Sequence, residues 1–126
     1  MIPKFRALIK ETEHIVDVET IHFELGVVKV NGIELYQFED VILMQSTGLH
    51  DKNGIEIFEG DIVEHIDFNS NEISKSEVRI LKGCFYLVIS VDGFKYDVPM
   101  MDLKDDECIL EIKGNVFENP EFLEDV

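Results

Sequence analysis

The chain has 126 residues, enough for one domain with its own hydrophobic core. Its 27 acidic and 11 basic residues give a formal net charge of −16 at pH 7. Because phosphate groups repel such a chain, we expect no direct binding to nucleic acid. The longest apolar run, residues 84–89, is far shorter than the roughly 20 residues of a membrane-spanning helix. With no signal-peptide core at the amino terminus, the sequence predicts a cytoplasmic protein that does not bind membranes.

Apolar residues recur at every second position along most of the chain, a spacing that predicts β-strands rather than helices. The strands expected in chain order are residues 4–9, 14–25, 27–30, 33–36, 60–68, 77–81, 87–91, 94–98 and 107–113. Another buried strand is expected to start at Val41 and to run into a series of turn signals.

Two dipeptides predict β-hairpins with two-residue type I′ turns, Asn31-Gly32 and Asp92-Gly93. In the first hairpin, a two-residue loop pairs Val30 with Ile33, Val28 with Leu35, and Lys29 with Glu34. In the second, it pairs Val91 with Phe94, Ile89 with Tyr96, and Leu87 with Val98. The apolar face of the second hairpin is large, so we expect this hairpin to lie in the centre of the core.

Polar composition predicts a flexible loop over residues 69–76. Asn119 followed by Pro120 is a helix-start signal for one or two turns, and residues 99–103 are expected to form another short turn. Cys84 and Cys108 lie within apolar runs and are expected to be reduced core residues.

These elements predict a mainly β fold in a single domain over residues 1–126. The expected architecture is a bent antiparallel sheet or a partly open small barrel, in which SH3-like elements can occur, with one or two short helical turns.

Three motifs span the chain: Met1-Ile-Pro-Lys-Phe-Arg-Ala7 at the start, residues 44–63 in the centre, and residues 114–124 at the end. The central motif reads Met-Gln-Ser-Thr-Gly-Leu-His-Asp-Lys-Asn-Gly-Ile-Glu-Ile-Phe-Glu-Gly-Asp-Ile-Val. Together they resemble the YopX family of bacteriophage and prophage proteins, although members often have a tryptophan in place of Leu8. The resemblance implies a mostly β fold, an origin in a phage or prophage, and a location in the cytoplasm of a bacterial host cell. It supplies no catalytic residues to transfer to this chain.

The central motif contains the candidate binding residues Asp51, Lys52, Asn53, Glu59 and Asp61. The favoured interpretation is a demanding chain reversal, with Asp51 and Lys52 exposed in a turn and Asp61 accepting turn hydrogen bonds. A binding loop and a catalytic loop are the alternatives.

His65 and Asp67 are weak candidates for metal ligands, since they share a strand face with Asp61. The favoured interpretation of these three residues is the solvent face of an amphipathic strand, and we expect neither a metal nor a cofactor. The sequence also lacks a Gly-x-Ser-x-Gly elbow and a phosphate loop that ends in Gly-Lys-Ser/Thr.

Two classes of function remain. The first is a non-enzymatic interaction or assembly factor that forms a homo-oligomer and binds an unknown host or phage protein. In its sharpest form, this factor is an acidic mimic of DNA. The alternative is a metal-dependent enzyme that acts on nucleotides or nucleic acid, and the sequence favours the first class.

Overall fold

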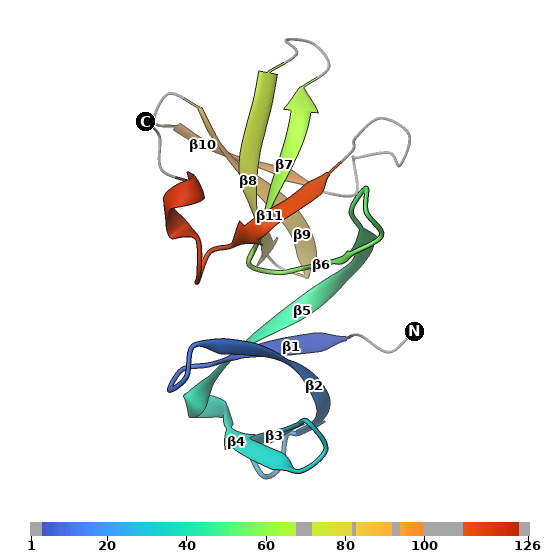
Figure 1. Ribbon diagram of the computed structural model, residues 1–126, viewed down its shortest axis with the longest axis vertical. Helices are drawn as coiled ribbons and strands as arrows, with labels where there is room; N and C mark the ends of the chain where they lie inside the picture. Colours follow the sequence, from blue (N-terminus) through green and yellow to red (C-terminus); the bar gives the residue numbers. More distant parts are fainter. Residues whose placement is uncertain (1–3, 68–71, 82, 92–93, 100–109, 124–126) are drawn as a thin grey trace. The chain divides into compact units, whose positions relative to one another are not determined.

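The computed structural model describes residues 4–67, 72–81, 83–91, 94–99 and 110–123 (Figure 1). The chain is mainly β, as predicted, and its strands form two antiparallel sheets. Neither sheet closes on itself within the described residues. Two compact units are present, and the boundary between them falls after Ser46. The described part of the chain contains no helix with the length and apolarity needed to cross a membrane.

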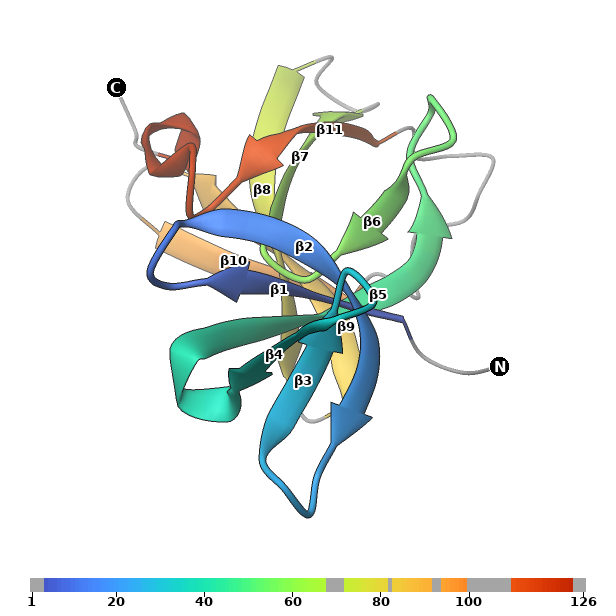
Figure 2. The same cartoon turned by 60° about the horizontal axis from the view of Figure 1, so that its bottom comes forward.

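The first unit is built on strands in the order β4-β3-β2-β1-β5 (Figure 2). Its elements are β1 (Phe5–Ile9), β2 (His14–His22), β3 (Val27–Val30), β4 (Glu34–Gln37), the 3-10 turn η1 (Phe38–Asp40) and the first part of β5 (Val41–His50). Its core is made of small and β-branched side chains from β1, β3 and β5, namely Ala7, Ile9, Val28, Val30 and Val41.

The predicted register of the first hairpin is wrong by one residue. The loop contains Ile33 as well as the Asn-Gly pair, so that Val30 lies opposite Glu34 and Val28 lies opposite Tyr36. Tyr36 therefore packs against the core of the first unit. Because side chains alternate along a strand, the same shift turns Leu35 outward.

The second unit contains the end of β5, which pairs with β6 (Glu56–Phe58), and a five-stranded sheet in the order β10-β9-β8-β7-β11. The strands of this sheet are β7 (Asp61–Asp67), β8 (Glu72–Leu81), β9 (Cys84–Val91), β10 (Phe94–Pro99) and β11 (Glu111–Asn115). The core consists of aliphatic side chains from β6, β7, β8, β9 and the residue before β11, namely Ile57, Val63, Val78, Leu87 and Leu110.

The predicted register of the second hairpin is confirmed, with Phe94 opposite Val91, Tyr96 opposite Ile89 and Val98 opposite Leu87. Its turn, residues 92–93, lies outside the described residues. The predicted central position is wrong for β10, because this strand is at the edge of the sheet and its Phe94 and Tyr96 side chains are 67% and 55% exposed. The core lies under β7, β8 and β9 instead.

Strand β8 starts at Glu72, within the segment predicted to be a loop. Pairing with β7, from Asp67 opposite Glu72 onward, extends the strand despite its polar composition. Residues 68–71 lie outside the described part of the chain. The predicted burial of Cys84 is also wrong, since Cys84 is exposed beside the turn that joins β8 to β9.

The predicted carboxyl-terminal helical turn is confirmed as the 3-10 turn η3 (Pro120–Leu123). The N–H of Phe122 donates to the carbonyl of Asn119, 3.0 Å away. The other predicted turn, residues 99–103, lies outside the described residues except for Pro99, which ends β10. Cys108 and the other residues of 107–109 in the predicted strand 107–113 are likewise outside the described part, whereas residues 111–113 lie in β11.

Candidate functional site

The turn between β5 and β6 is organised around the carboxylate of Asp51. Its Oδ1 accepts hydrogen bonds from the backbone N–H groups of Asn53 and Ile55, each at 2.9 Å. Gly54 adopts a φ of 81°, which suits glycine, and its N–H donates to the Asp51 carbonyl at 3.0 Å. Asp51 is only 7% exposed, so the prediction that it is an exposed turn residue is wrong. The carboxylate can be buried because the backbone N–H groups of the turn supply hydrogen bonds that water would otherwise make with it.

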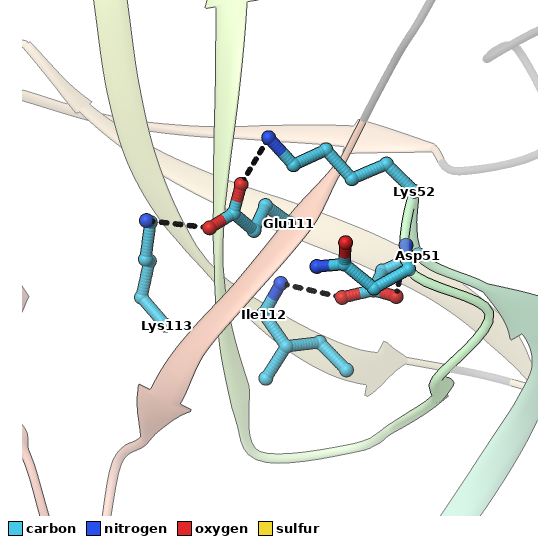
Figure 3. Close-up of polar contacts among 6 residues, drawn as sticks. Asp51, Lys52, Glu111, Ile112 and Lys113 are labelled. Atoms are coloured by element: carbon cyan, nitrogen blue, oxygen red, sulfur yellow. Dashed lines mark hydrogen bonds and ion pairs between the residues drawn. The ribbon is translucent and has the colours of Figure 1, made fainter.

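Asp51 also joins this turn to β11, 61 positions further along the chain. Its Oδ2 accepts the N–H of Ile112 at 3.1 Å (Figure 3). The N–H of Lys52 donates to the carbonyl of Leu110 at 2.9 Å. Burial alone raises the pKa of Asp51, but the hydrogen bonds from Ile112, Ile55 and Asn53 together outweigh it and leave the pKa below its usual value. The carboxylate is therefore ionised at neutral pH.

On the exposed side of β11, Glu111 lies between two lysines. One carboxylate oxygen contacts Lys52 Nζ from the turn, and the other lies 2.6 Å from Lys113 Nζ (Figure 3). Lys113 and Lys52 lower the pKa of Glu111 from its ordinary 4.5 to about 2. Sequence reasoning placed Lys52 in the candidate loop but did not include Glu111 or Lys113, since no local pattern brings β11 to this turn.

The low pKa of Glu111 predicts how stability changes with pH. Because the pKa of Glu111 is lower in the folded chain than in the unfolded chain, its ionised form stabilises the fold at pH values above the unfolded-state pKa of 4.5. This contribution decreases below that pH and is lost as the pH falls through the folded-state pKa of about 2. We expect the Glu111→Gln chain to be less stable than wild type at pH 7 and to approach wild type near pH 2. Urea unfolding across this pH range tests the expectation, with Glu121→Gln as a control of equal formal charge. If the free energies of unfolding of wild type and Glu111→Gln differ by the same amount at pH 7 and near pH 2, the expectation is contradicted.

The second half of the central motif forms the β6–β7 turn. Oδ2 of Asp61 accepts the N–H of Phe58 at 2.8 Å, as the sequence predicted for this aspartate. Gly60 has a φ of 89° and links two further segments, donating to the Val78 carbonyl and accepting from the N–H of Val116. Asp61 is only 2% exposed, so its predicted place on a solvent face is wrong. Glu59, another candidate binding residue, is half-buried in the same turn.

The two weak metal candidates are not shown to converge on a metal site. Nε2 of His65 lies 3.1 Å from Oγ of Ser76 on β8, at hydrogen-bonding distance. The side chain of Asp67 is outside the described part of the chain. Among the residues that the structure describes, no three His, Cys, Asp or Glu side chains are grouped so that they could hold a metal ion.

In the closing motif, as in the central one, a side-chain oxygen accepts hydrogen bonds from nearby backbone N–H groups. Oδ1 of Asn115 accepts the N–H groups of Phe117 and Glu118, at 3.0 and 2.9 Å. Gly114 sits at an irregularity in the β7–β11 pairing, and a Cβ at this position would overlap the side chain of Asn119. The close approach explains why the motif has glycine here.

The amino-acid pattern of the YopX protein family matches residues 4–124. The chain belongs to the YopX family. It is similar to the crystal structure of protein EF1440 from Enterococcus faecalis, with 27% identity and a TM-score of 0.65 over 98% of this chain and 99% of that one. The crystal structure of protein yopX from Bacillus subtilis has 19% identity and a TM-score of 0.63, covering 96% and 98%, and supports the fold alone. No curated protein matches the sequence.

The chemistry of the central motif in this YopX family member is that of a structural acceptor. The carboxylate of Asp51 receives three backbone N–H groups, and that of Asp61 receives the N–H of Phe58. A carboxylate with a lowered pKa is a weak base, so Asp51 is poorly suited to proton abstraction. A binding role for Asp51, Lys52, Asn53, Glu59 and Asp61 stays a prediction.

Proposed function

We propose that this YopX family member is a non-enzymatic interaction factor of a bacteriophage or prophage, and that it binds an extended, basic and apolar segment of a host or phage protein along β4. The observation that carries the proposal is the exposure of four large apolar side chains around this strand. Ile33, Phe23, Leu25 and Leu35 are 87%, 77%, 76% and 61% exposed. We call these four residues the hairpin surface.

The hairpin surface follows the course of β4. Ile33 directly precedes the strand and Leu35 lies on it. The β2–β3 turn, which carries Phe23 and Leu25, adjoins the other end of β4, because the N–H of Phe38 donates to the carbonyl of Gly26 at 2.9 Å. Within the described residues, β4 pairs with β3 alone. An added strand along the other edge of β4 would meet apolar side chains from one end to the other.

Charge around β4 selects a basic partner. Glu34 on β4, Glu24 in the adjoining turn, and Glu39 and Asp40 in η1 are all exposed. Lys29 on β3 lies opposite Leu35, and Nζ of Lys10 donates to the carbonyl of Glu39 at 2.8 Å, so these four acids outnumber two lysines. Acidic neighbours around an apolar strand edge favour a segment in which apolar residues alternate with lysine or arginine. They disfavour nucleic acid, whose phosphates they repel.

Peptide selection tests the proposal. Random peptides displayed on a library and selected on the whole protein are expected to be enriched in alternating basic and apolar residues. Leu35→Ser should weaken binding of one selected peptide by about tenfold or more, since residues at the centre of an interface carry most of its binding free energy. The control is Ile73→Ser on β8, which removes a 64% exposed apolar side chain from the second unit.

Three outcomes contradict the proposal: selected peptides without basic enrichment, an undiminished affinity of Leu35→Ser, or an equal loss in Ile73→Ser. Random duplex DNA serves as a second probe, and we expect no submicromolar binding at physiological salt. Tight, salt-sensitive binding of this duplex would replace the proposed function with a nucleic-acid role.

A further inference from the structure

The edge strand β10 of the second unit has a self-complementary order of side chains. Within the described residues, β10 pairs with β9 alone. Residues 94–97 are all exposed. Because neighbours on a strand point to opposite faces, Phe94 and Tyr96 share one face with Val98, and Lys95 and Asp97 share the other. One face is thus apolar, and the other carries one positive and one negative charge.

We propose that β10 is a homodimer interface at which two copies of the chain pair their β10 strands in antiparallel orientation about a two-fold axis at Tyr96. In this register Tyr96 lies opposite the partner's Tyr96, and Phe94 lies opposite the partner's Val98. On the other face, Lys95 lies opposite the partner's Asp97, and the symmetry repeats this pair. The two five-stranded sheets join into one continuous sheet, an isologous arrangement typical of two-fold dimers. This interface is independent of the segment-binding role of β4.

The charges of Lys95 and Asp97 favour this register over the registers centred one residue earlier or later. A two-fold axis perpendicular to the sheet keeps each side chain on its own face, so it must lie midway between a residue and the same residue of the partner strand. An axis at Lys95 places two lysines opposite each other, and an axis at Asp97 places two aspartates opposite each other. Like charges directly across a pair of strands are destabilising, whereas opposite charges stabilise the pair. Tyr96 is the central residue that satisfies both faces.

A charged residue on an edge strand often prevents association, and Lys95 alone would do so. Asp97 changes this outcome, because it supplies the matching charge two positions away on the same face. Pro99 ends the strand and has no N–H group, which limits pairing to the five residues 94–98. Such a short interface falls below the roughly 1,200 Å² of a standard stable complex, so we expect a weak, concentration-dependent dimer. At −16 per chain, association should strengthen as moderate salt screens the overall repulsion.

Complementary charge reversals test the interface in the full chain. Lys95→Asp leaves each chain with two acids at the pairing positions, and Asp97→Lys leaves each with two lysines. By sedimentation at moderate salt, wild type should dimerise with rising concentration, while each variant alone should dimerise at least about tenfold more weakly. An equimolar mixture of the two variants should recover association as a heterodimer, since every cross-strand pair is again of opposite charge. Circular dichroism of each variant confirms that both positions, which are exposed, tolerate the change.

Disulfide trapping gives a second readout of the register. In a chain with Cys84 and Cys108 replaced by serine, Tyr96→Cys should form a covalent dimer on mild oxidation, because residue 96 faces its own copy. Phe94→Cys is the matched control, since its own copy lies four residues away along the partner strand, about 13 Å. A monomeric wild type at all concentrations overturns the proposal. So does a mixture of charge variants that stays monomeric, or equal cross-linking of the two cysteine variants.

Discussion

Replacing Asp51 by alanine is expected to lower the free energy of unfolding by about 2–5 kcal/mol, because three backbone N–H groups lose a charged acceptor in a buried site. Those groups belong to Asn53 and Ile55 in the turn and to Ile112 on β11. The alanine chain should unfold at a lower urea concentration with a similar dependence on urea.

Asp51→Asn distinguishes the hydrogen bonds that Oδ1 accepts within the turn from the one that Oδ2 accepts from β11. If the amide oxygen takes the position of Oδ1, it still accepts from Asn53 and Ile55, but the amide nitrogen faces the N–H of Ile112, donor to donor. An intermediate loss of stability is therefore expected. A loss below about 1 kcal/mol for Asp51→Ala would show that water or a rearranged turn replaces the carboxylate, and the structural role given to the central motif would be wrong.

Leu87→Ala is expected to cost about 2–5 kcal/mol, the usual range for emptying a buried aliphatic site. Leu87 is 1% exposed and belongs to the core cluster with Val63 and Val78. Ile89→Ala, two positions along β9, should cost less, because Ile89 is only partly buried against that core.

Phe94→Ser is the control for Leu87→Ala, since Phe94 belongs to the same hairpin but is 67% exposed. Its effect on monomer stability should stay within about 0.5 kcal/mol, which is usual for a surface substitution. The comparison is made in urea at a protein concentration low enough to keep the chain monomeric. Equal losses for Leu87→Ala and Phe94→Ser would place the core under β10 rather than β9.

The two hairpins show how far a local pattern determines strand register. For β9 and β10, alternation and an assumed two-residue loop predict the pairs from Val91–Phe94 to Leu87–Val98, although the strand pairing extends one residue further, to Pro99. For β3 and β4, the Asn-Gly signal locates the turn but not the loop length, and the packing of Tyr36 in the core adds Ile33 to the loop. The polar start of β8 was missed for a related reason, since its pairing with β7 outweighs its composition.

The candidate site was predictable only in its local part. The two halves of the central motif, with glycines at residues 54 and 60, indicate turns, and both glycines have positive φ. Burial of Asp51 depends on Ile112, 61 residues away, and the low pKa of Glu111 depends on Lys52 from the turn. Contacts of this range leave no signal in a short window of sequence. Nor does composition show that the exposed apolar residues of the first unit gather around β4.

Mapping a selected peptide onto the backbone amides by NMR discriminates most directly between the two candidate binding surfaces. We predict that titrating a basic, apolar peptide shifts the amide signals of β4 and its adjoining turns, from Phe23 to Gly26 and from Ile33 to Gln37. The amides of the central turns, from Asp51 to Asp61, should move little. Shifts confined to those central turns, with β4 unaffected, would contradict the proposed function and assign binding to the candidate loop instead.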